Sequence, residues 1–221
     1  MGALGEHQVR MSSPARGLPD RVSPSASRQE PAGHPQAARW RYASLAGRLT
    51  ELAGGGASAT LTFACALVLE AQGQGEPVAW ISRPESTCFP PDLAESGVDL
   101  DALILVRVPD APAVARAAAI LARSGAFGVL VLDLGAEATV PLALQARLLG
   151  LARQHAVALL CLTEKRRTAP SLSSLVSLRA ETRRCQVGPD RFTCTLTALK
   201  DKRDGPGWSY VGEYCAPLGL R

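Results

Sequence analysis

Segments of strand length alternate with helical patterns along the middle of the chain. Between the strand-like segments, apolar residues recur at helical spacing over residues 60–72, 112–124 and 142–155. Buried strands that alternate with helices predict βαβ units, so we expect an α/β fold with a mostly parallel central sheet flanked by helices. The segments expected to form buried strands are residues 48–52, 77–81, 103–108, 127–132 and 157–162.

The pattern changes after Pro170. Residues 172–180, 191–200 and 209–214 are shorter, alternating segments joined by turns rich in Gly, Pro and Asp. Such segments favour antiparallel strands, and we expect them to extend the sheet at the C-terminal end. Trp80 lies in a predicted buried strand and is expected in the core. His155 ends a predicted helix, where a histidine interacts favourably with the helix dipole.

The N-terminal segment has a different composition. Residues 1–38 are rich in Pro, Ser, Gly and Arg and show neither helical nor strand periodicity, which predicts a disordered tail. One domain is then expected over residues 39–221. The apolar runs are much shorter than the roughly 20 residues of a membrane span, and no apolar signal segment is evident, so a cytoplasmic protein that does not contact membranes is expected.

Cysteine and histidine spacing does not favour a metal site. The six cysteines form no C-x-x-C pair, and the three histidines are scattered, whereas zinc sites need closely spaced ligands. We expect reduced, structural thiols, with Cys65 and Cys161 in the core. No cofactor is expected.

The net charge of +4 is unevenly distributed. Residues 161–203 hold ten basic and four acidic residues, a charge of +6, and the rest of the chain sums to −2. The basic, β-rich part at 161–221 fits phosphate contacts, but edge strands also carry charges that prevent unwanted pairing. Trp208 and Tyr210, beside Lys202 and Arg203, fit either base stacking or packing against an edge or a partner surface.

A glycine-rich turn lies between the first predicted strand and helix. A working phosphate loop reads G-x-x-x-x-G-K-[ST], in which the lysine neutralises phosphate and the hydroxyl binds magnesium. From Gly54, these positions hold Ala59 instead of the second glycine, Thr60 instead of lysine and Leu61 instead of the hydroxyl. We interpret Gly54, Gly55, Gly56 and Thr60 as a vestigial phosphate loop and do not expect an enzyme.

Short motifs resemble the recombinase RecA in their order and spacing over residues 47–220. These are the sequence GRLTEL from Gly47, residues 96–103, residues 123–126 leading into 129–133, residues 175–179 and residues 197–202. The resemblance implies a RecA-like P-loop-type domain in which Asp133 is a vestigial Walker B residue. It also implies that Lys200 and Lys202 match lysines of RecA that reach a neighbouring subunit's nucleotide.

The chain departs from RecA at its functional positions. Glu85 matches the catalytic glutamate only after a one-residue shift, which favours a surface carboxylate. The two DNA-binding loops of RecA are shortened here to residues 134–141 and 164–170. These departures favour a protein that keeps the fold of RecA without its ATP-driven activity.

Small inactive relatives of RecA form the ImuA family, also described as SulA-like. This chain resembles that family in its degenerate phosphate loop, shortened DNA loops and basic C-terminal part. The resemblance implies a non-catalytic accessory protein of DNA-damage-induced (SOS) translesion synthesis and mutagenesis. Its implied partners are ImuB, an inactive Y-family polymerase-like hub, and RecA.

Three alternatives remain open at this point: a SulA-like regulator of cell division or of RecA filaments, a direct single-stranded DNA-binding protein, and a residual ATPase that depends on Asp133. Weak DNA binding would use the basic region. The residues expected to contact DNA or a partner are Lys165, Arg166, Arg167, Lys200, Lys202 and Arg203.

Overall fold

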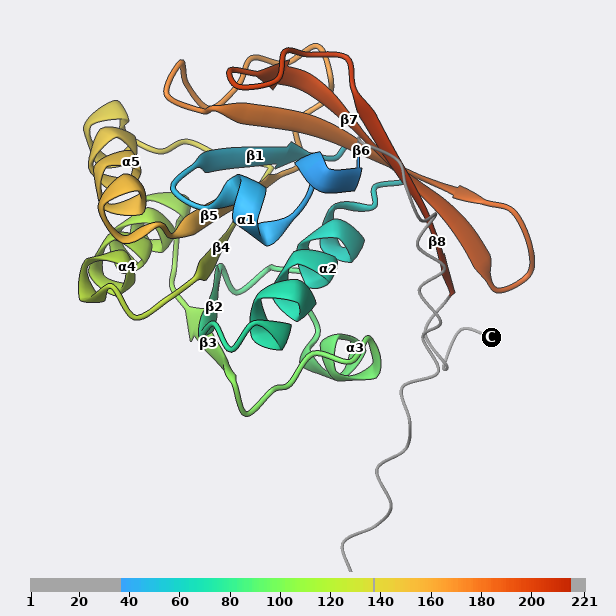
Figure 1. Cartoon of the computed structure of the whole chain (residues 1–221), viewed down its shortest axis with the longest axis horizontal. Coiled ribbons are helices and arrows are strands. Elements are labelled where there is room, and N and C mark those ends of the chain that lie inside the picture. Colours follow the sequence, from blue (N-terminus) through green and yellow to red (C-terminus); the bar gives the residue numbers. More distant parts are fainter. Residues whose placement is uncertain (1–36, 137, 216–221) are drawn as a thin grey trace, which may run out of the picture.

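All eight strands belong to one sheet in a computed structural model, which describes residues 37–136 and 138–215. The sheet order is β3-β2-β4-β5-β1-β6-β7-β8, parallel from β3 through β6 and antiparallel from β6 to β8. This confirms the α/β class with an antiparallel C-terminal extension (Figure 1). The strands are β1 (Leu49–Ala53), β2 (Val78–Ser82), β3 (Leu103–Arg107), β4 (Val129–Gly135), β5 (Ala158–Thr163), β6 (Leu178–Gln186), β7 (Arg191–Asp201) and β8 (Ser209–Cys215).

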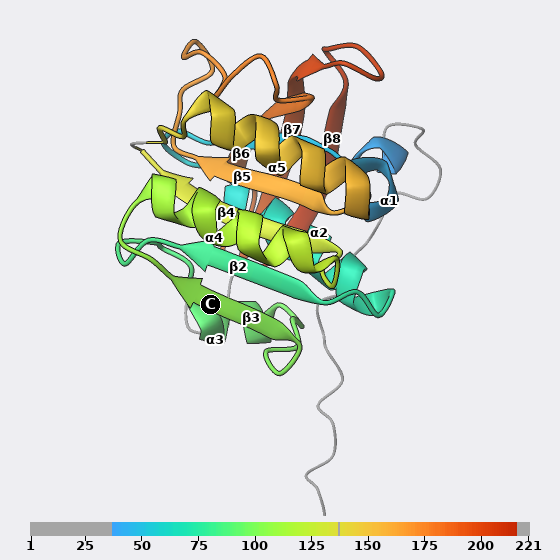
Figure 2. The ribbon, with the colours of Figure 1, turned by 90° about the vertical axis from the view of Figure 1, so that its left-hand side faces the viewer.

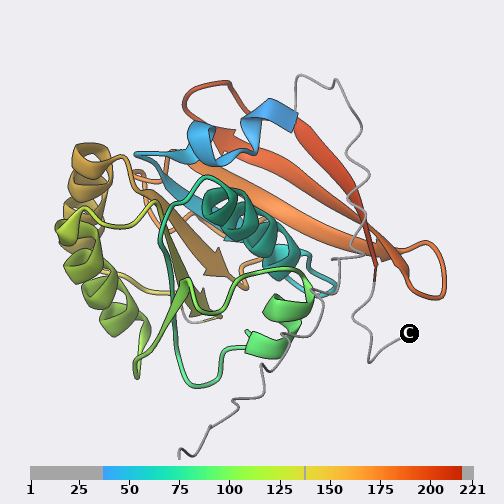
Figure 3. The same ribbon diagram turned by 60° about the horizontal axis from the view of Figure 1, so that its bottom comes forward.

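Helices cover both faces of the parallel part of the sheet. Figure 2 shows α4 and α5 side by side over one face, and Figure 3 shows α2 on the other. Both faces are therefore buried, which explains the nearly continuous apolar sequences of β2, β4 and β5. The helical elements are η1 (Ala37–Arg39), α1 (Tyr42–Leu45), α2 (Thr60–Gly73), α3 (Pro90–Glu95), α4 (Ala111–Ser124) and α5 (Leu142–His155).

Two apolar clusters form the core, one on each side of the sheet. Phe63 and Trp80 belong to the cluster beneath α2, and Ile81 and Leu132 to the cluster beneath α4 and α5. Trp80, Cys65 and Cys161 are buried as predicted. Burial raises the pKa of the Cys65 thiol to about 12, so this sulfur is a poor nucleophile at neutral pH.

The segment 103–108 does form a strand over Leu103–Arg107, but the prediction that this strand is buried is wrong. Among the described strands β3 pairs with β2 alone and is an edge of the sheet, so Ile104 and Leu105 are 48% and 42% exposed. The apolar sequence of an edge strand and that of a central strand look alike, and only the sheet order distinguishes them.

The prediction of a strand at 172–180 is wrong in its first half. Strand β6 begins at Leu178 and continues to Gln186, whereas residues before it form a loop fixed by serine side chains. Ser173 Oγ donates to Gln145 Oε1 at 2.6 Å, and Ser177 Oγ donates to the Leu49 carbonyl at 3.1 Å. These bonds attach the segment to α5 and β1.

His155 is the last residue of α5, at the predicted helix end. Its ring lies against Gly125, which ends α4 with a φ of +68°, and a β-carbon there would lie 2.8 Å from His155 Nδ1. Glycine is therefore required at this position both for its backbone conformation and for space.

The predicted tail falls almost entirely outside the described residues; Ala37 and Ala38 belong to η1. Within residues 37–136 and 138–215, no helix has the length and apolar character needed to cross a membrane.

Candidate functional site

The glycine-rich turn connects β1 to α2 at the carboxyl end of the parallel strands, where α/β proteins commonly bind ligands. Gly54 donates its N–H to the Thr163 carbonyl of β5 at 2.9 Å. Ser58 Oγ lies 2.5 Å from Thr60 Oγ1 and accepts a hydrogen bond from the Thr60 N–H at 3.1 Å. Thr182 Oγ1 of β6 lies 3.0 Å from Ser58 Oγ and 2.8 Å from Thr60 Oγ1. The three hydroxyls form one closed cluster.

This hydroxyl cluster lies directly against Gly54. A β-carbon on Gly54 would overlap Ser58 Oγ and Thr60 Oγ1, so the turn has closed onto its own side chains. Thr60 takes the position of the phosphate-loop lysine, but its hydroxyl is directed toward β6. Leu61, in place of the magnesium ligand, packs against the core beneath α2. At the aligned positions, the turn therefore has neither the lysine that neutralises phosphate nor the hydroxyl that binds magnesium.

Asp133 occupies β4 at the same edge of the sheet. Ser86 Oγ donates to Asp133 Oδ2 at 2.5 Å. Burial raises the pKa of the Asp133 carboxyl, although the Ser86 hydrogen bond and the nearby Arg83 partly oppose that shift. Arg83 lies close against Gly135, where a β-carbon would overlap its guanidinium. The groups that act on this carboxylate include the Ser86 hydroxyl, the Gly135 backbone N–H and the charge of Arg83, and none of these three comes from the glycine-rich turn.

Glu85 lies on the surface. Its carboxylate is 3.9 Å from Arg83 Nη1, and its side chain is 69% exposed. This exposed position agrees with the interpretation of Glu85 as a surface carboxylate.

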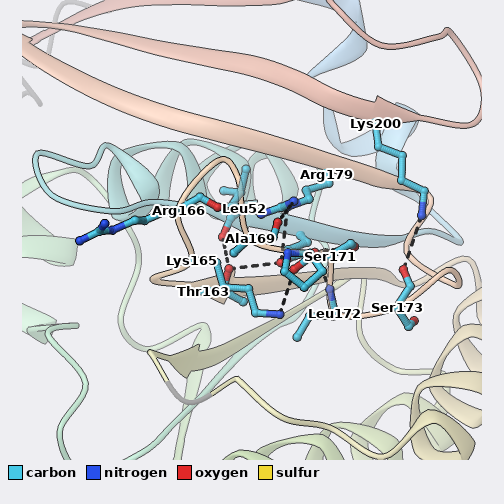
Figure 4. A network of polar contacts seen from close by, with 12 residues as sticks. Leu52, Thr163, Lys165, Arg166, Ala169, Ser171, Leu172, Ser173, Arg179 and Lys200 are labelled. Atoms are coloured by element: carbon cyan, nitrogen blue, oxygen red, sulfur yellow. Dashed lines mark hydrogen bonds and ion pairs between the residues drawn. The ribbon is translucent and has the colours of Figure 1, made fainter.

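A buried ion pair holds the β5–β6 loop and was not predicted from the sequence (Figure 4). Glu51, fully buried on β1, accepts hydrogen bonds from Ser171 Oγ at 2.7 Å and from the Leu172 N–H at 3.0 Å. Arg179 Nε lies 3.7 Å from Glu51 Oε1. The sequence did contain a signal for this pair. Glu51 lies within a strand predicted to be buried, and a buried charge needs a partner of opposite charge.

Arg179 also fixes the loop backbone directly. Its Nη1 donates to the Ala169 carbonyl at 2.5 Å and its Nη2 to the Arg166 carbonyl at 3.1 Å. The segment that corresponds to a DNA-binding loop in the RecA resemblance is therefore tied to the core.

A second buried pair joins Arg48, the residue before β1, to Asp201 at the end of β7. Arg48 Nη2 lies 2.6 Å from Asp201 Oδ1, and Trp208 Nε1 donates to Asp201 Oδ2 at 3.1 Å. Trp208 is buried, which matches the packing interpretation and leaves its ring unavailable to bases. Tyr210 packs against Phe63 with ring centroids 5.9 Å apart.

The basic residues expected to contact DNA or a partner lie in different environments. Most of them bond to groups of this chain: Lys165 to the Pro170 carbonyl, Arg167 to Glu181, Lys200 to the Ser173 and Ser174 carbonyls, Lys202 to the Ser174 carbonyl and Arg203 to the Ser44 carbonyl. The guanidinium of Arg166 forms no hydrogen bond or ion pair within residues 37–136 and 138–215, and Figure 4 shows it extending away from the network.

Three arginines of the β6–β7 hairpin were not among the predicted contacts. Arg183 pairs with Glu181 at 3.5 Å, whereas Arg184 and Arg191 are exposed and make no ion pair with described residues. Arg183 and Arg184 belong to the hairpin because β6 continues to Gln186. The sequence pattern predicted that this strand ends at residue 180.

No group of three or more His, Cys, Asp or Glu residues in the described ranges is arranged to hold a metal ion. Comparisons of the chain with protein-family models and with curated proteins gave no match.

Proposed function

We propose that this protein is a non-catalytic, RecA-like accessory protein of DNA-damage-induced translesion synthesis, as the ImuA resemblance implies. It acts in the cytoplasm by docking on the polymerase-like hub ImuB, and RecA is a second proposed partner. The observation that carries the proposal is the closed hydroxyl cluster of Ser58, Thr60 and Thr182 in place of a phosphate-binding turn.

The arrangement of the vestigial residues supports a RecA-like origin. The glycine-rich turn follows β1, Asp133 lies in β4, and β5 lies between these two strands. Both positions are at the carboxyl edge of the sheet, as a nucleotide site requires. The turn has lost its lysine and its magnesium ligand, and Asp133 hydrogen-bonds to Ser86. A scaffold of this kind can bind a partner without a nucleotide-driven switch.

The edge strand β3 supports a docking role. Ile104 and Leu105 expose apolar side chains there, and within residues 37–136 and 138–215 the only strand that pairs with β3 is β2. An apolar edge strand with free backbone groups is a template for an added strand of a partner. We assign ImuB to this edge.

Co-purification with ImuB tests the proposal. We expect Ile104→Glu to reduce recovery of the complex because it places a charge on the docking edge. Val211→Glu is the matched control, since Val211 is 47% exposed on the opposite edge strand β8. Failure of the unmodified protein to bind ImuB or RecA, or equal recovery with both variants, would contradict the proposal.

A further inference from the structure

The outer surface of the helix pair α4 and α5 is basic. Neither helix contains Asp or Glu, and each contains two arginines, Arg116 and Arg123 in α4 and Arg147 and Arg153 in α5. All four arginine side chains are exposed. Figure 2 shows both helices facing the viewer, with no other described element in front of them. This layer of the molecule therefore presents positive charge to solvent.

Three residues form a row along the outside of α4. Arg116, Ile120 and Arg123 are four and three positions apart, which is the spacing of neighbours on a helix surface. Ile120 is 68% exposed, whereas the buried side of α4 consists of alanines and Val114. A large apolar side chain thus lies in solvent between two arginines.

A similar row on α5 lies next to α4. His155 of α5 lies against Gly125, which ends α4, so the side of α5 that carries His155 faces α4. Leu151 precedes His155 by four positions and Arg147 precedes Leu151 by four, so the three follow one side of the helix. Leu151 is partly buried and Arg147 is exposed. The boundary between the two helices therefore has apolar side chains at its centre and arginines around them.

Two of these arginines are free to bind another molecule. Asp110, which caps α4, lies 3.8 Å from Arg116 in an exposed ion pair. Arg123 and Arg147 form no hydrogen bond or ion pair with residues of the described ranges. We call the following five side chains the arginine–apolar surface: Arg116, Ile120 and Arg123 of α4 with Arg147 and Leu151 of α5.

A glycine lies within the exposed part of α5 beside this surface. Gly150 follows Arg147 by three positions, and a β-carbon on it would have no atom within 4 Å. The packing of the described chain therefore does not require glycine here, although glycine stabilises a helix less than alanine does. Without a side chain at this position, the backbone of a docked element can approach α5 closely.

Charge and apolar character together select the occupant of this surface. A second copy of this face would bring arginines against arginines, and like charges across a contact oppose binding. A nucleic acid would leave Ile120 and Leu151 without an apolar partner. Carboxylates pair with guanidinium groups through two parallel hydrogen bonds, and an amphipathic helix docks through apolar residues at positions i, i+3, i+4 and i+7.

We propose that the arginine–apolar surface binds an acidic amphipathic helix of a partner protein. Apolar residues of that helix pack against Ile120 and Leu151, and its Asp or Glu side chains pair with Arg123, Arg147 and Arg116. Arg116 and Arg123 are about 10 Å apart along the axis of α4 at the helical rise of 1.5 Å per residue, so about two turns of the partner helix cover the row. This proposal does not rest on the docking of ImuB at β3.

Selection from a displayed library of random peptides tests the proposal. Peptides selected on the unmodified protein should be enriched in Asp and Glu and in apolar residues three and four positions apart. Fluorescence anisotropy with the most enriched peptide, labelled, should give an affinity that falls as salt increases. Arg123→Glu/Arg147→Glu should bind that peptide about tenfold or more weakly, because two attractive charge pairs become repulsive. Ile120→Ser repeats the test without a change of charge, and far-UV circular dichroism checks the fold.

Arg153→Glu is the matched control. Arg153 is exposed but is two positions from His155, about 200° around the helix, so it lies on the side of α5 away from α4. Its affinity for the peptide should remain close to that of the unmodified protein, and so should that of Ile104→Glu at the β3 edge. Selected peptides without acidic and apolar residues, equal binding by the double variant, an equal loss in either control, or equal binding of anionic lipid vesicles would overturn the proposal.

Discussion

At the scale of single residues, two buried carboxylates connect segments that are far apart in the sequence. Glu51 and Asp201 each accept hydrogen bonds from two or more groups and face a buried arginine. The sequence shows that Glu51 and Asp201 are carboxylates near predicted strands, but it does not show which arginine each of them pairs with. Arg179 and Arg48 are separated from those carboxylates by more than a hundred positions, and only the strand order brings them together.

Removal of one partner of the buried pair should strongly destabilise the fold. We expect Arg179→Met to lower the free energy of unfolding by about 3–5 kcal/mol, because Glu51 would remain buried without a counter-charge. Arg167→Met is the control: its exposed pair with Glu181 is worth about 0–1 kcal/mol. Denaturant unfolding measures both variants, and similar losses in the two would refute the role given to Glu51.

Asp201 and Asp133 should affect stability with opposite dependence on pH. Although burial raises the pKa of Asp201, the Arg203 N–H, Arg48 and Trp208 lower it overall, below its ordinary 3.8. Its stabilisation is therefore complete above pH 3.8 and decreases as the pH falls through the folded-state pKa. Burial raises the pKa of Asp133 above 3.8, so its favourable contribution is present below pH 3.8 and is lost as the pH rises through the folded-state pKa.

Unfolding free energies of Asp201→Asn and Asp133→Asn, measured against pH, check these signs. The advantage of the unmodified protein over Asp201→Asn should shrink as the solution becomes more acidic. The free energy of unfolding of the unmodified protein minus that of Asp133→Asn should decrease as the pH increases toward neutral. The same pH trend in both variants would contradict the two environments described for these carboxylates.

At the scale of elements, apolar runs predicted the central strands and the long helices. They did not predict which apolar segments face solvent or form a loop. The segment 103–108 has the composition of a buried strand, yet β3 is an edge because of the sheet order. Residues 172–177 alternate like a strand, yet Ser173 and Ser177 bond to other elements. The glycine-rich turn was placed correctly, whereas its hydroxyl cluster needs Thr182 from a distant strand.

Glycine substitutions test the closed form of this turn. Gly54→Ala should lower the free energy of unfolding by about 1–3 kcal/mol, because its methyl group would overlap the hydroxyls of Ser58 and Thr60. Gly55→Ala should change it by about 0.5 kcal/mol or less, since the nearest atom would be Arg166 Cγ at 3.5 Å. Equal stability of the two variants in denaturant unfolding would show that the hydroxyls do not lie against Gly54.

At the scale of the whole molecule, the sheet joins two different surfaces. Its β3 edge is apolar and is proposed to dock ImuB, and the opposite part is the antiparallel extension of β6, β7 and β8. The glycine-rich turn and Asp133 lie at the carboxyl edge of the parallel strands, and each is hydrogen-bonded to other groups of this chain. In the function proposed above, this fold binds partners and does not turn over ATP.

Isothermal titration of the purified protein with ATP, in the presence and absence of magnesium, tests this central claim most directly. We predict no saturable binding in the micromolar range under either condition, because Thr60 and Leu61 supply neither the phosphate cation nor the magnesium ligand. Saturable, magnesium-dependent binding of ATP in that range would contradict the account.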